Sequence, residues 1–369
     1  MLTNQERLIL LNLIPDVGSA RWRRLLDAFG DVGHLWTASV QDLQRAGGLA
    51  PKLAERVDAV RHADARLRDE LALAHRHGVE ILTLEDDAYP ALLRTIPDPP
   101  LALYVRGSLP AADEVAIGVV GARHASAYGL QCAERLSYDL AMRGLTVVSG
   151  LAHGIDGAAH RGALNAAGRT LAVLGNGLAQ IYPPEHEQLA EQVVKQGALI
   201  SEYPMDTAPL PHNFPHRNRL ISGLSRGVVV VEAAQRSGAL ITADCALEQG
   251  REVFAVPGPM TSVTSHGTHQ LLKQGARLVT SVEDILDELQ LGVQPVRETA
   301  AARAREAAPA LPEPERRVFA CVGEDRARDI DVIAEESGLG MPEVSSLLLQ
   351  LELKRLIQQL PGKQFVRCR

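Results

Sequence analysis

Six short apolar runs in the middle of the chain constrain its fold more than any other feature. Small and branched aliphatic residues fill them almost without interruption, as in strands buried on both faces of a sheet. Helical stretches separate most of the runs, which is the arrangement of a parallel sheet covered by helices on both sides. We therefore expect an α/β fold that binds its ligand at the carboxyl ends of the strands. The runs are residues 115–120, 145–148, 170–174, 198–200, 227–231 and 252–256.

The chain has 369 residues, which is enough for two or three domains. Residues 1–75 are predicted to form a helical domain, with helices at 20–29 and 52–60 behind tight turns. Such turn-then-helix pairs resemble SAM or helix-hairpin-helix domains, and the latter offer backbone N–H groups to DNA phosphates. Asp16 stands where that motif usually has glycine, and its charge would repel phosphate. A structural or protein-contact role is therefore favoured over DNA binding.

The C-terminal part of the chain changes pattern twice. Residues 291–314 are rich in Ala, Pro, Glu and Arg without apolar periodicity, which predicts a linker after a sheet domain at 76–290. Residues 315–369 then carry a helix, a glycine-containing turn, a second helix and a hairpin, which together predict a winged helix-turn-helix domain. Because its second helix carries Glu343 and Glu352, this domain is expected to contact protein, or DNA only weakly.

Composition argues against several classes of protein. No run of about 18 apolar residues is present and the N-terminus lacks a signal-peptide layout, so we expect no membrane span and a cytoplasmic location. The four cysteines show no Cys-x-x-Cys spacing, which argues against a zinc knuckle or a disulfide framework. The formal net charge of -7 argues against nonspecific coating of nucleic acid but allows a focused anion site.

A basic segment interrupts this acidic chain. No Asp or Glu lies between Asp206 and Glu232, a stretch that contains three arginines. Arginine suits phosphate because its planar fork can hold two oxygens at once. The segment 214–219, Phe-Pro-His-Arg-Asn-Arg, therefore predicts a phosphate site. Phe214 beside the arginines fits base stacking and core packing equally well.

A second anion motif follows the first strand of the predicted sheet. Gly121, Arg123 and Ser126 lie between that strand and a helix expected to begin near Ser126. The first N–H groups of the helix, the hydroxyl and the guanidinium would converge on one anion. The alternative is a tight turn with a serine cap and a solvated arginine.

A third motif opens the helix after the 227–231 run. Ser237, Gly238 and Thr242 place small and hydroxyl residues at that helix start, a composition that again suits phosphate. Several phosphate-sized sites along one sheet edge favour a polymer such as single-stranded DNA over a mononucleotide.

Other chemistries have less support. His153, Asp156 and His160 would share one helix face as a metal site, but the glycines around them favour packing and capping. The Gly-Asn-Gly sequence at 175–177 lacks the later glycine of a dinucleotide fingerprint, so NAD is not expected. Glu232 at the end of a strand is either a general base or the partner of an arginine.

Together these motifs resemble the DNA-processing protein family DprA, also called Smf. The resemblance is specific over about residues 110–285 and weaker over the flanking helical domains. It implies an extended Rossmann-like domain that binds single-stranded DNA and forms a homodimer. Members protect incoming DNA during natural transformation and help load the RecA recombinase, so a mediator rather than an enzyme is expected, with neither metal nor cofactor. The motifs that carry the resemblance are 120–123, 149–156, 214–219, 237–242 and 256–258.

The resemblance also implies roles for individual residues. Phosphates would be contacted by Arg123, Arg217 and Arg219. The pocket would be shaped by Gly121, Ser126 and Asn218, with Phe214 against a base and its edge extended by Ser237, Gly238 and Thr242. His186 and His269 stand where the family usually has Asn, and Pro184 where some relatives have Lys, which puts contacts from those two loops in doubt.

Two alternatives remain open. A related Rossmann group cleaves nucleoside monophosphates and carries a Pro-Gly-Gly-x-Gly-Thr loop near a catalytic Glu, whereas residues 257–260 here read Pro-Gly-Pro-Met. A regulator of duplex DNA acting through the winged helix is the other alternative. The acidic character of its second helix argues against it.

Overall fold

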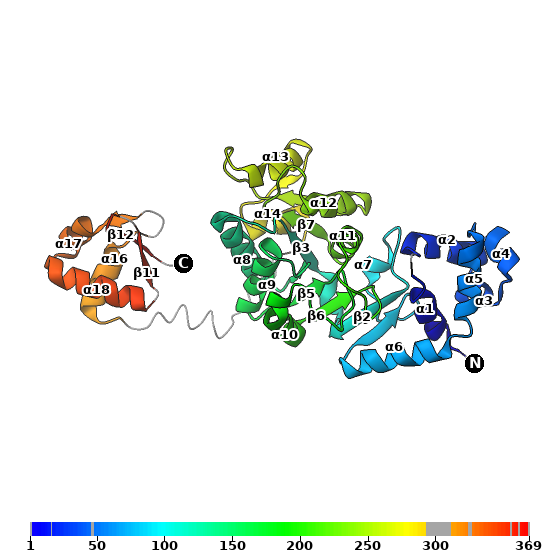
Figure 1. Ribbon diagram of the computed structural model, residues 1–369. Helices are drawn as coiled ribbons and strands as arrows, with labels where there is room; N and C mark the ends of the chain where they lie inside the picture. Colours follow the sequence, from blue (N-terminus) through cyan, green and yellow to red (C-terminus); the bar gives the residue numbers. More distant parts are fainter. Residues whose placement is uncertain are drawn as a thin grey trace. The chain divides into compact units, whose positions relative to one another are not determined.

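The computed structural model describes residues 2–15, 17–45, 48–292, 311–323, 327–354, 356–360 and 362–367. The chain divides into two compact units, Met1–Thr299 and Ala300–Arg369 (Figure 1). Most of the predicted linker at 291–314, and Asp16 in the first predicted turn, lie outside the described residues.

A mixed, mostly parallel sheet forms the centre of the first unit. Among the described residues it has nine strands in the order β1-β2-β6-β5-β4-β3-β7-β8-β9. Strand β2 is antiparallel to both of its neighbours, and the remaining pairs are parallel. The strands are β1 Glu80–Thr83, β2 Ala102–Gly107, β3 Ala116–Val120, β4 Thr146–Ser149, β5 Thr170–Val173, β6 Ala198–Ser201, β7 Gly227–Val230, β8 Glu252–Ala255 and β9 Arg277–Leu278.

All six apolar runs form strands, β3 to β8, which confirms the predicted parallel sheet. Strands β1, β2 and β9 extend that prediction at the two edges of the sheet. Alternate residues of each strand face opposite layers. Ala172 of β5 belongs to the core that includes Ala190 and Val193, whereas its neighbour Leu171 belongs to the core that includes Leu220 and Ile221.

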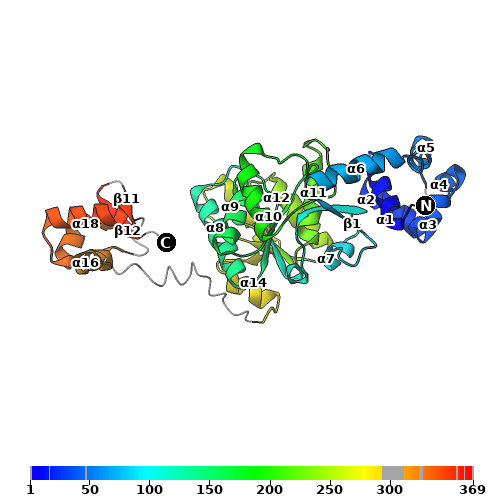
Figure 2. The same ribbon diagram turned by 90° about the horizontal axis from the view of Figure 1, so that it is seen from below.

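Helices therefore cover both faces of the sheet (Figures 1 and 2). Helix α10 lies on one face, and α11 and α12 lie on the other. The helices of this region are α7 Ala91–Arg94, α8 Ala127–Met142, α9 Ile155–Asn165, α10 Glu187–Gln196, α11 Asn213–Gly223, α12 Gly238–Glu248, α13 His266–Lys273 and α14 Val282–Glu288, with 3-10 turns η1 Ala111–Glu114, η2 Pro184–His186 and η3 Val263–Ser265.

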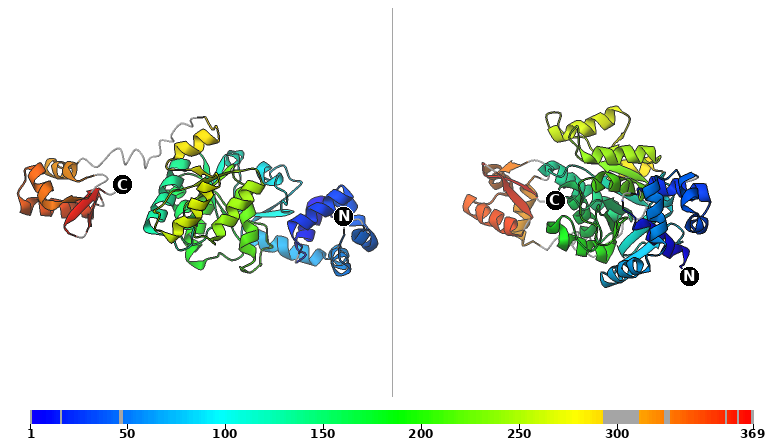
Figure 3. Two further views of the ribbon diagram at one scale, coloured as in Figure 1. Left: turned by 90° about the horizontal axis from the view of Figure 1, so that it is seen from above. Right: turned by 45° about the vertical axis from the view of Figure 1, so that its right-hand side comes forward.

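The N-terminal residues are helical, as predicted, and Figure 3 shows them in blue as a small bundle. Leu10, Leu25 and Leu43 are fully buried in its core. Thr3 and Glu6 form a reciprocal capping box that begins the first helix. The helices are α1 Asn4–Asn12, α2 Ser19–Phe29, α3 Val32–Thr37, α4 Val40–Arg45, α5 Pro51–Val60 and α6 Asp64–Arg76.

The second unit is the predicted winged helix. Figure 2 shows α16 and α18 with the β11–β12 hairpin, and Val318, Ile333 and Leu348 lie in their common core. Gly338 ends the second helix in the left-handed conformation that favours glycine. The elements are α16 Glu313–Cys321, β10 Arg328–Asp329, α17 Ile330–Ser337, α18 Met341–Leu353, β11 Ile357–Leu360 and β12 Gln364–Arg367. No helix in the described part of the chain is both long and apolar enough to cross a membrane.

Candidate functional site

The strand order reverses at the centre of the sheet, where β3 lies between β4 and β7. At such a switch point the loops after the two neighbouring strands diverge and leave a crevice at the carboxyl edge. The loop after β3 carries Arg123, and the loop after β7 carries Glu232. Helix α11 brings Phe214 and Arg217 to the same edge of the sheet.

Arg123 and Phe214 meet above the ends of the strands. The Arg123 guanidinium carbon lies 5.3 Å from the centre of the Phe214 ring, within cation–π range. The ring of Tyr182 lies 5.6 Å from that of Phe214. A Cβ atom at Gly175, after β5, would come within 2.9 Å of the Phe214 ring, so glycine leaves the space that the ring fills. We call the group Arg123, Gly175, Tyr182, Phe214 and Arg217 the arginine pocket.

Arg217 is the deepest member of the arginine pocket, with a relative exposure of only 3%. Its Nη1 donates to the carbonyl oxygens of Gly150, at 2.8 Å, and Val173. Its Nε donates to Asn218 Oδ1 at 3.3 Å. No carboxylate of the described residues lies within ion-pair distance. Burial lowers the pKa of Arg217 to about 10, so the side chain stays charged at neutral pH without a paired counter-charge.

Asp156 is the nearest source of negative charge behind the arginine pocket. Its Oδ2 accepts from the backbone N–H groups of Gly150, at 3.1 Å, and Ala152, at 3.4 Å. Burial raises the pKa of Asp156, and the charge of Arg217 partly offsets that effect. A Cβ at Gly150 would lie 2.6 Å from both Arg217 Nη2 and Asp156 Oδ2, so only glycine fits between them.

Close packing holds the loop that carries Arg123. The backbone N–H of Ile155 donates to the carbonyl of Ala122 at 3.2 Å. Gly154 has φ of 72°, and a Cβ there would lie 2.3 Å from Ala122 O. Gly121 packs in the same way against Ile155, 2.6 Å from a built Cβ. Arg123 itself is exposed.

The N-terminus of α8 is already occupied by a carboxylate. Ser126 caps the helix, as in the alternative interpretation of this motif, by accepting from Gly129 N at 3.1 Å. Glu232 accepts from Ser126 N at 2.9 Å, Ser126 Oγ at 2.6 Å and Thr264 Oγ1 at 3.1 Å. The predicted arginine pair of Glu232 is therefore wrong, because within the described residues the carboxylate bonds to a helix N-terminus and no arginine lies within ion-pair distance.

The start of helix α12 contacts Asn218 of α11, beside Arg217. Asn218 Nδ2 donates to the carbonyl of Gly238 at 3.1 Å. Ser237 caps α12 by accepting from Ala239 N at 3.3 Å. Thr242 is buried on the inner side of the helix and contributes packing. Ser237 and Gly238 thus lie beside Asn218, while Thr242 lies beneath them.

Arg219 faces away from the arginine pocket. Its Nε lies 2.9 Å from Asp98 Oδ2, and its Nη2 lies 2.5 Å from Glu202 Oε2. Nη2 also donates to Ser19 Oγ, at the start of α2, at 2.8 Å. Burial acts to lower the pKa of Arg219, but the carboxylates of Glu202 and Asp98 raise it overall. The structure thus separates Arg219 from Arg123 and Arg217, with which it was grouped from the sequence.

The residues weighed as a metal site do not converge. His153 lies before the first residue of α9 and is exposed, so it does not share a helix face with Asp156 and His160. His160 is fully buried, with Nδ1 2.7 Å from Thr170 Oγ1, and burial lowers its pKa to about 3. In the described residues no group of three or more His, Cys, Asp or Glu is placed to hold a metal ion.

Several members of the site were not predicted. Tyr182 lies in a Tyr-Pro-Pro turn, and its ring beside Phe214 depends on how the loop after β5 folds back. Gly150 and Val173 contribute carbonyl oxygens, and a backbone acceptor has no signature in the sequence. Gly175 had a usable signal, because a glycine directly after a buried strand often permits close approach of another group.

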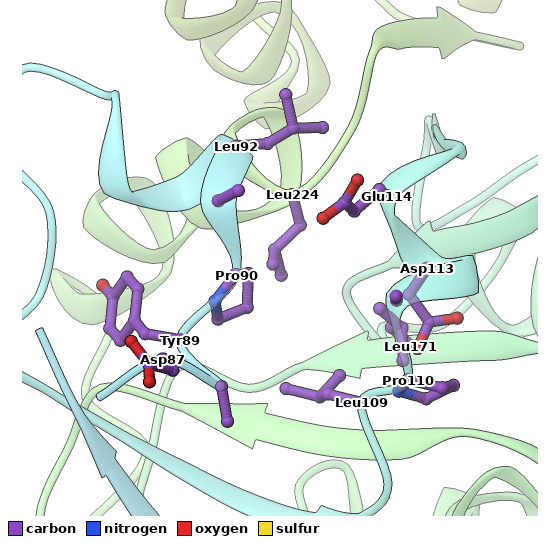
Figure 4. A pocket seen from close by; sticks show the side chains of 13 residues that line it. Asp87, Tyr89, Pro90, Leu92, Leu109, Pro110, Asp113, Glu114, Leu171 and Leu224 are labelled. Carbon is purple, nitrogen blue, oxygen red and sulfur yellow. The ribbon is translucent and has the colours of Figure 1, made fainter.

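A small cavity of about 220 Å³ lies outside the arginine pocket, between residues 87–92, residues 109–114 and the side chains of Leu171 and Leu224 (Figure 4). Aliphatic side chains form most of its wall, and the ionisable residues that line it are all acidic. Asp113 pairs with Arg169 at 2.8 Å, whereas Asp87 and Glu114 are exposed and form no ion pair within the described residues. This cavity is unsuited to phosphate. The residues labelled in Figure 4 are Asp87, Tyr89, Pro90, Leu92, Leu109, Pro110, Asp113, Glu114, Leu171 and Leu224.

Known proteins share both units of the chain. Residues 80–290 match the family of DNA recombination-mediator protein A, and residues 302–363 match the DprA winged helix domain. Protein Smf of Escherichia coli is 48% identical over 293 residues, which cover 78% of this chain and 77% of that protein. The structure of DNA processing protein A from Streptococcus pneumoniae has a TM-score of 0.69 at 36% identity, covering 78% of this chain and 98% of that chain. The structure of DNA processing protein A from Helicobacter pylori, which is described by its single-stranded DNA binding mode, has a TM-score of 0.52 at 29% identity. The match covers 57% of this chain and 96% of that chain.

Proposed function

Because the chain belongs to the family of DNA recombination-mediator protein A, we propose that it binds single-stranded DNA at the arginine pocket and acts as a recombination mediator. The observation that carries the proposal is Arg217, a buried cation bonded to backbone carbonyls and lacking a carboxylate at ion-pair distance in the described residues. A phosphate would supply the missing counter-charge. The single-stranded DNA binding described for the Helicobacter pylori relative supports this assignment.

In this proposal the two parts of a nucleotide are bound by different side chains. Arg123 and Arg217 bind phosphates, and the rings of Phe214 and Tyr182 stack on bases. Stacking accepts every base and phosphate contacts carry no sequence information, so binding is sequence-independent and weakens with salt. Gly121 and Asn218 shape the pocket, Ser237 and Gly238 form its α12 side, and Thr242 supports that side from beneath. Ser126 and Arg219 support the pocket from behind and do not touch DNA.

An enzymatic role has less support. The nucleotide hydrolase alternative requires a carboxylate that reaches substrate, and the loop after β7 at the switch point supplies Glu232. Its exposure is 2% and its oxygens accept from Ser126 and Thr264, which leaves it poorly placed as a general base. We propose a mediator without catalytic activity, and release of base from AMP by the purified protein would contradict this.

We further propose that the sheet domain forms a homodimer and that the bound DNA is delivered to the RecA recombinase. Met260, Val263 and Leu278 are large apolar side chains with exposures of 87%, 66% and 52%, near the β9 edge of the sheet. Exposed apolar groups of this kind are typical of protein interfaces. Sedimentation of Met260→Asp tests this surface, with a shift to monomer expected.

Fluorescence anisotropy with labelled oligo-dT tests DNA binding directly. The expected result is tight binding by the native protein and a loss of about tenfold or more in Arg123→Ala and in Arg217→Ala, with a shallower salt dependence in each. Arg135→Ala is the matched control, because Arg135 is an exposed arginine of α8 whose one ion pair within the described residues is with Asp139. Equal binding by all four proteins would show that the DNA site lies elsewhere.

A further inference from the structure

We propose that Glu232 is a positioning residue that fixes the Arg123 loop by occupying, with its own carboxylate, the anion site at the switch point of the sheet. The inference rests on the proposed DNA-binding function of the arginine pocket. Ligands of sheets like this one bind at the switch point, next to a helix N-terminus. Here that position holds a side chain of the protein itself.

The first step of the argument is the fit of the carboxylate to the start of α8. One oxygen accepts from the backbone N–H of Ser126, and the other accepts from the Ser126 and Thr264 hydroxyls. A Cβ at Gly129 would lie 2.4 Å from the Glu232 carboxyl group, so the first turn of α8 closes directly over it. An external phosphate has no room there.

The second step concerns charge. No Lys, Arg or His nitrogen of the described residues lies within ion-pair distance of Glu232, although the side chain is almost fully buried. Backbone and hydroxyl donors, with the positive end of the helix dipole, are its compensation. A phosphate bound at a helix N-terminus is held by the same set of donors.

The third step is what the carboxylate connects. Its bonds join the loop of Arg123 and Ser126 to the loop that contains Thr264. Two neighbouring contacts strengthen this junction: Ala233 N donates to Thr264 O at 2.7 Å, and Tyr128 OH donates to Pro257 O at 2.7 Å. Arg123 is three residues from the Ser126 anchor and is therefore held over Phe214 before any DNA arrives. A preordered arginine loses less conformational freedom on binding phosphate.

The proposal predicts an effect opposite in sign to simple electrostatics. Removing a negative charge from the neighbourhood of a phosphate site should tighten DNA binding if Glu232 acts only through its charge. If Glu232 positions Arg123, the neutral variant Glu232→Gln should bind more weakly, because the amide has one accepting oxygen. The carboxylate uses two, one for the Ser126 N–H and one for the Ser126 and Thr264 hydroxyls.

The experiment is a double-mutant cycle on oligo-dT affinity with native protein, Glu232→Gln, Arg123→Ala and the double variant. We expect Glu232→Gln to bind about tenfold more weakly, with a salt slope reduced by about 0.7 for one lost phosphate contact. In the Arg123→Ala background the second substitution should add little, because the two act through one contact. A loss that adds fully in the double variant indicates a general structural role and overturns the proposal. Unchanged or tighter binding by Glu232→Gln also overturns it.

Two controls keep the test decisive. Asp113→Asn removes a buried carboxylate at the opposite edge, where Asp113 pairs with Arg169, and should leave DNA affinity unchanged even where stability falls. If Glu232→Gln does not fold, Ser126→Ala removes the hydroxyl bond to the intact carboxylate and should show the same dependence on Arg123. If the native protein fails to bind oligo-dT, the proposed function is contradicted. If the native protein binds and Glu232→Gln binds equally well, only this inference is contradicted.

Discussion

Two faces of helix α11 carry arginines that look equivalent in the sequence but differ in their bonding partners and in the direction of their pKa shifts. Arg217 and Arg219 are two residues apart, which places them about 200° apart around a helix. Arg217 faces the strand ends and bonds to carbonyl oxygens, while Arg219 faces Asp98 and Glu202. Burial lowers the pKa of the first, and the two carboxylates raise that of the second despite burial.

The difference teaches which buried arginines are available to a ligand. A guanidinium surrounded by carboxylates is already neutralised and holds the protein together. A guanidinium with backbone carbonyl partners keeps its net charge, and its free energy improves when an anion arrives. The counter-charge of an arginine therefore indicates its role better than its exposure, since both side chains are buried here.

The largest expected effect is a difference between Arg219 and Arg217 in how much their replacement lowers the free energy of unfolding. Arg219→Met should lower the free energy of unfolding by about 3–5 kcal/mol, because it leaves Glu202 buried without its counter-charge. Arg217→Met is the matched control and should cost less than half as much, since no ion pair is broken. Urea denaturation of both variants measures this. Equal losses would mean that the two faces are not distinct.

The second prediction concerns the pH dependence of stability that arises from His160 of α9, near Arg217. His160 is neutral in the folded protein, because burial and the nearby charges of His186, Arg161 and Arg217 lower its pKa to about 3. The unfolded chain takes up a proton below about pH 6.5, whereas the folded chain does not, so stability falls with acidification. This residue alone should remove about 2 kcal/mol between pH 8 and pH 5. His160→Asn should flatten the pH profile of urea unfolding by that amount, and an unchanged profile would contradict the burial of a neutral ring.

A third prediction tests base stacking on Phe214 in the arginine pocket. Phe214→Leu keeps an apolar side chain beside Gly175 but removes the aromatic surface, and should weaken oligo-dT binding by about 1–2 kcal/mol. Because a base stacks on a ring without reading it, the loss should be similar for oligo-dT and oligo-dC. Anisotropy at one salt concentration measures both. A loss confined to one base would indicate hydrogen-bond recognition instead of stacking.

The smallest expected effect concerns the helix beside α11. Ser237→Ala removes the cap of α12 and should lower the free energy of unfolding by about 1 kcal/mol. Since Asn218 bonds the carbonyl of Gly238 and not the serine hydroxyl, DNA affinity should change little. A loss of affinity larger than the loss of stability would place Ser237 itself on the DNA.

The sheet was predictable because buried parallel strands need continuous apolar runs, and β3 to β8 each have one. Strand β2 runs antiparallel between β1 and β6, a topology that apolar content does not encode. At the site, Arg123, Phe214 and Arg217 follow from residue type and position. The separation of Arg219 required knowing that Asp98 and Glu202, far away in the sequence, pack against the same face of α11. The role of Glu232 depended equally on a distant partner, Ser126.

The glycine between Arg217 and Asp156 has a consequence for how the site tolerates mutation. The Gly150 N–H donates to the Asp156 carboxylate, and the Gly150 carbonyl oxygen accepts from Arg217. One residue therefore connects a buried cation to a buried anion through its backbone. A built Cβ there would lie 2.6 Å from both side chains. Any side chain at position 150 would thus displace the cation and the anion together, although neither charged residue had been changed.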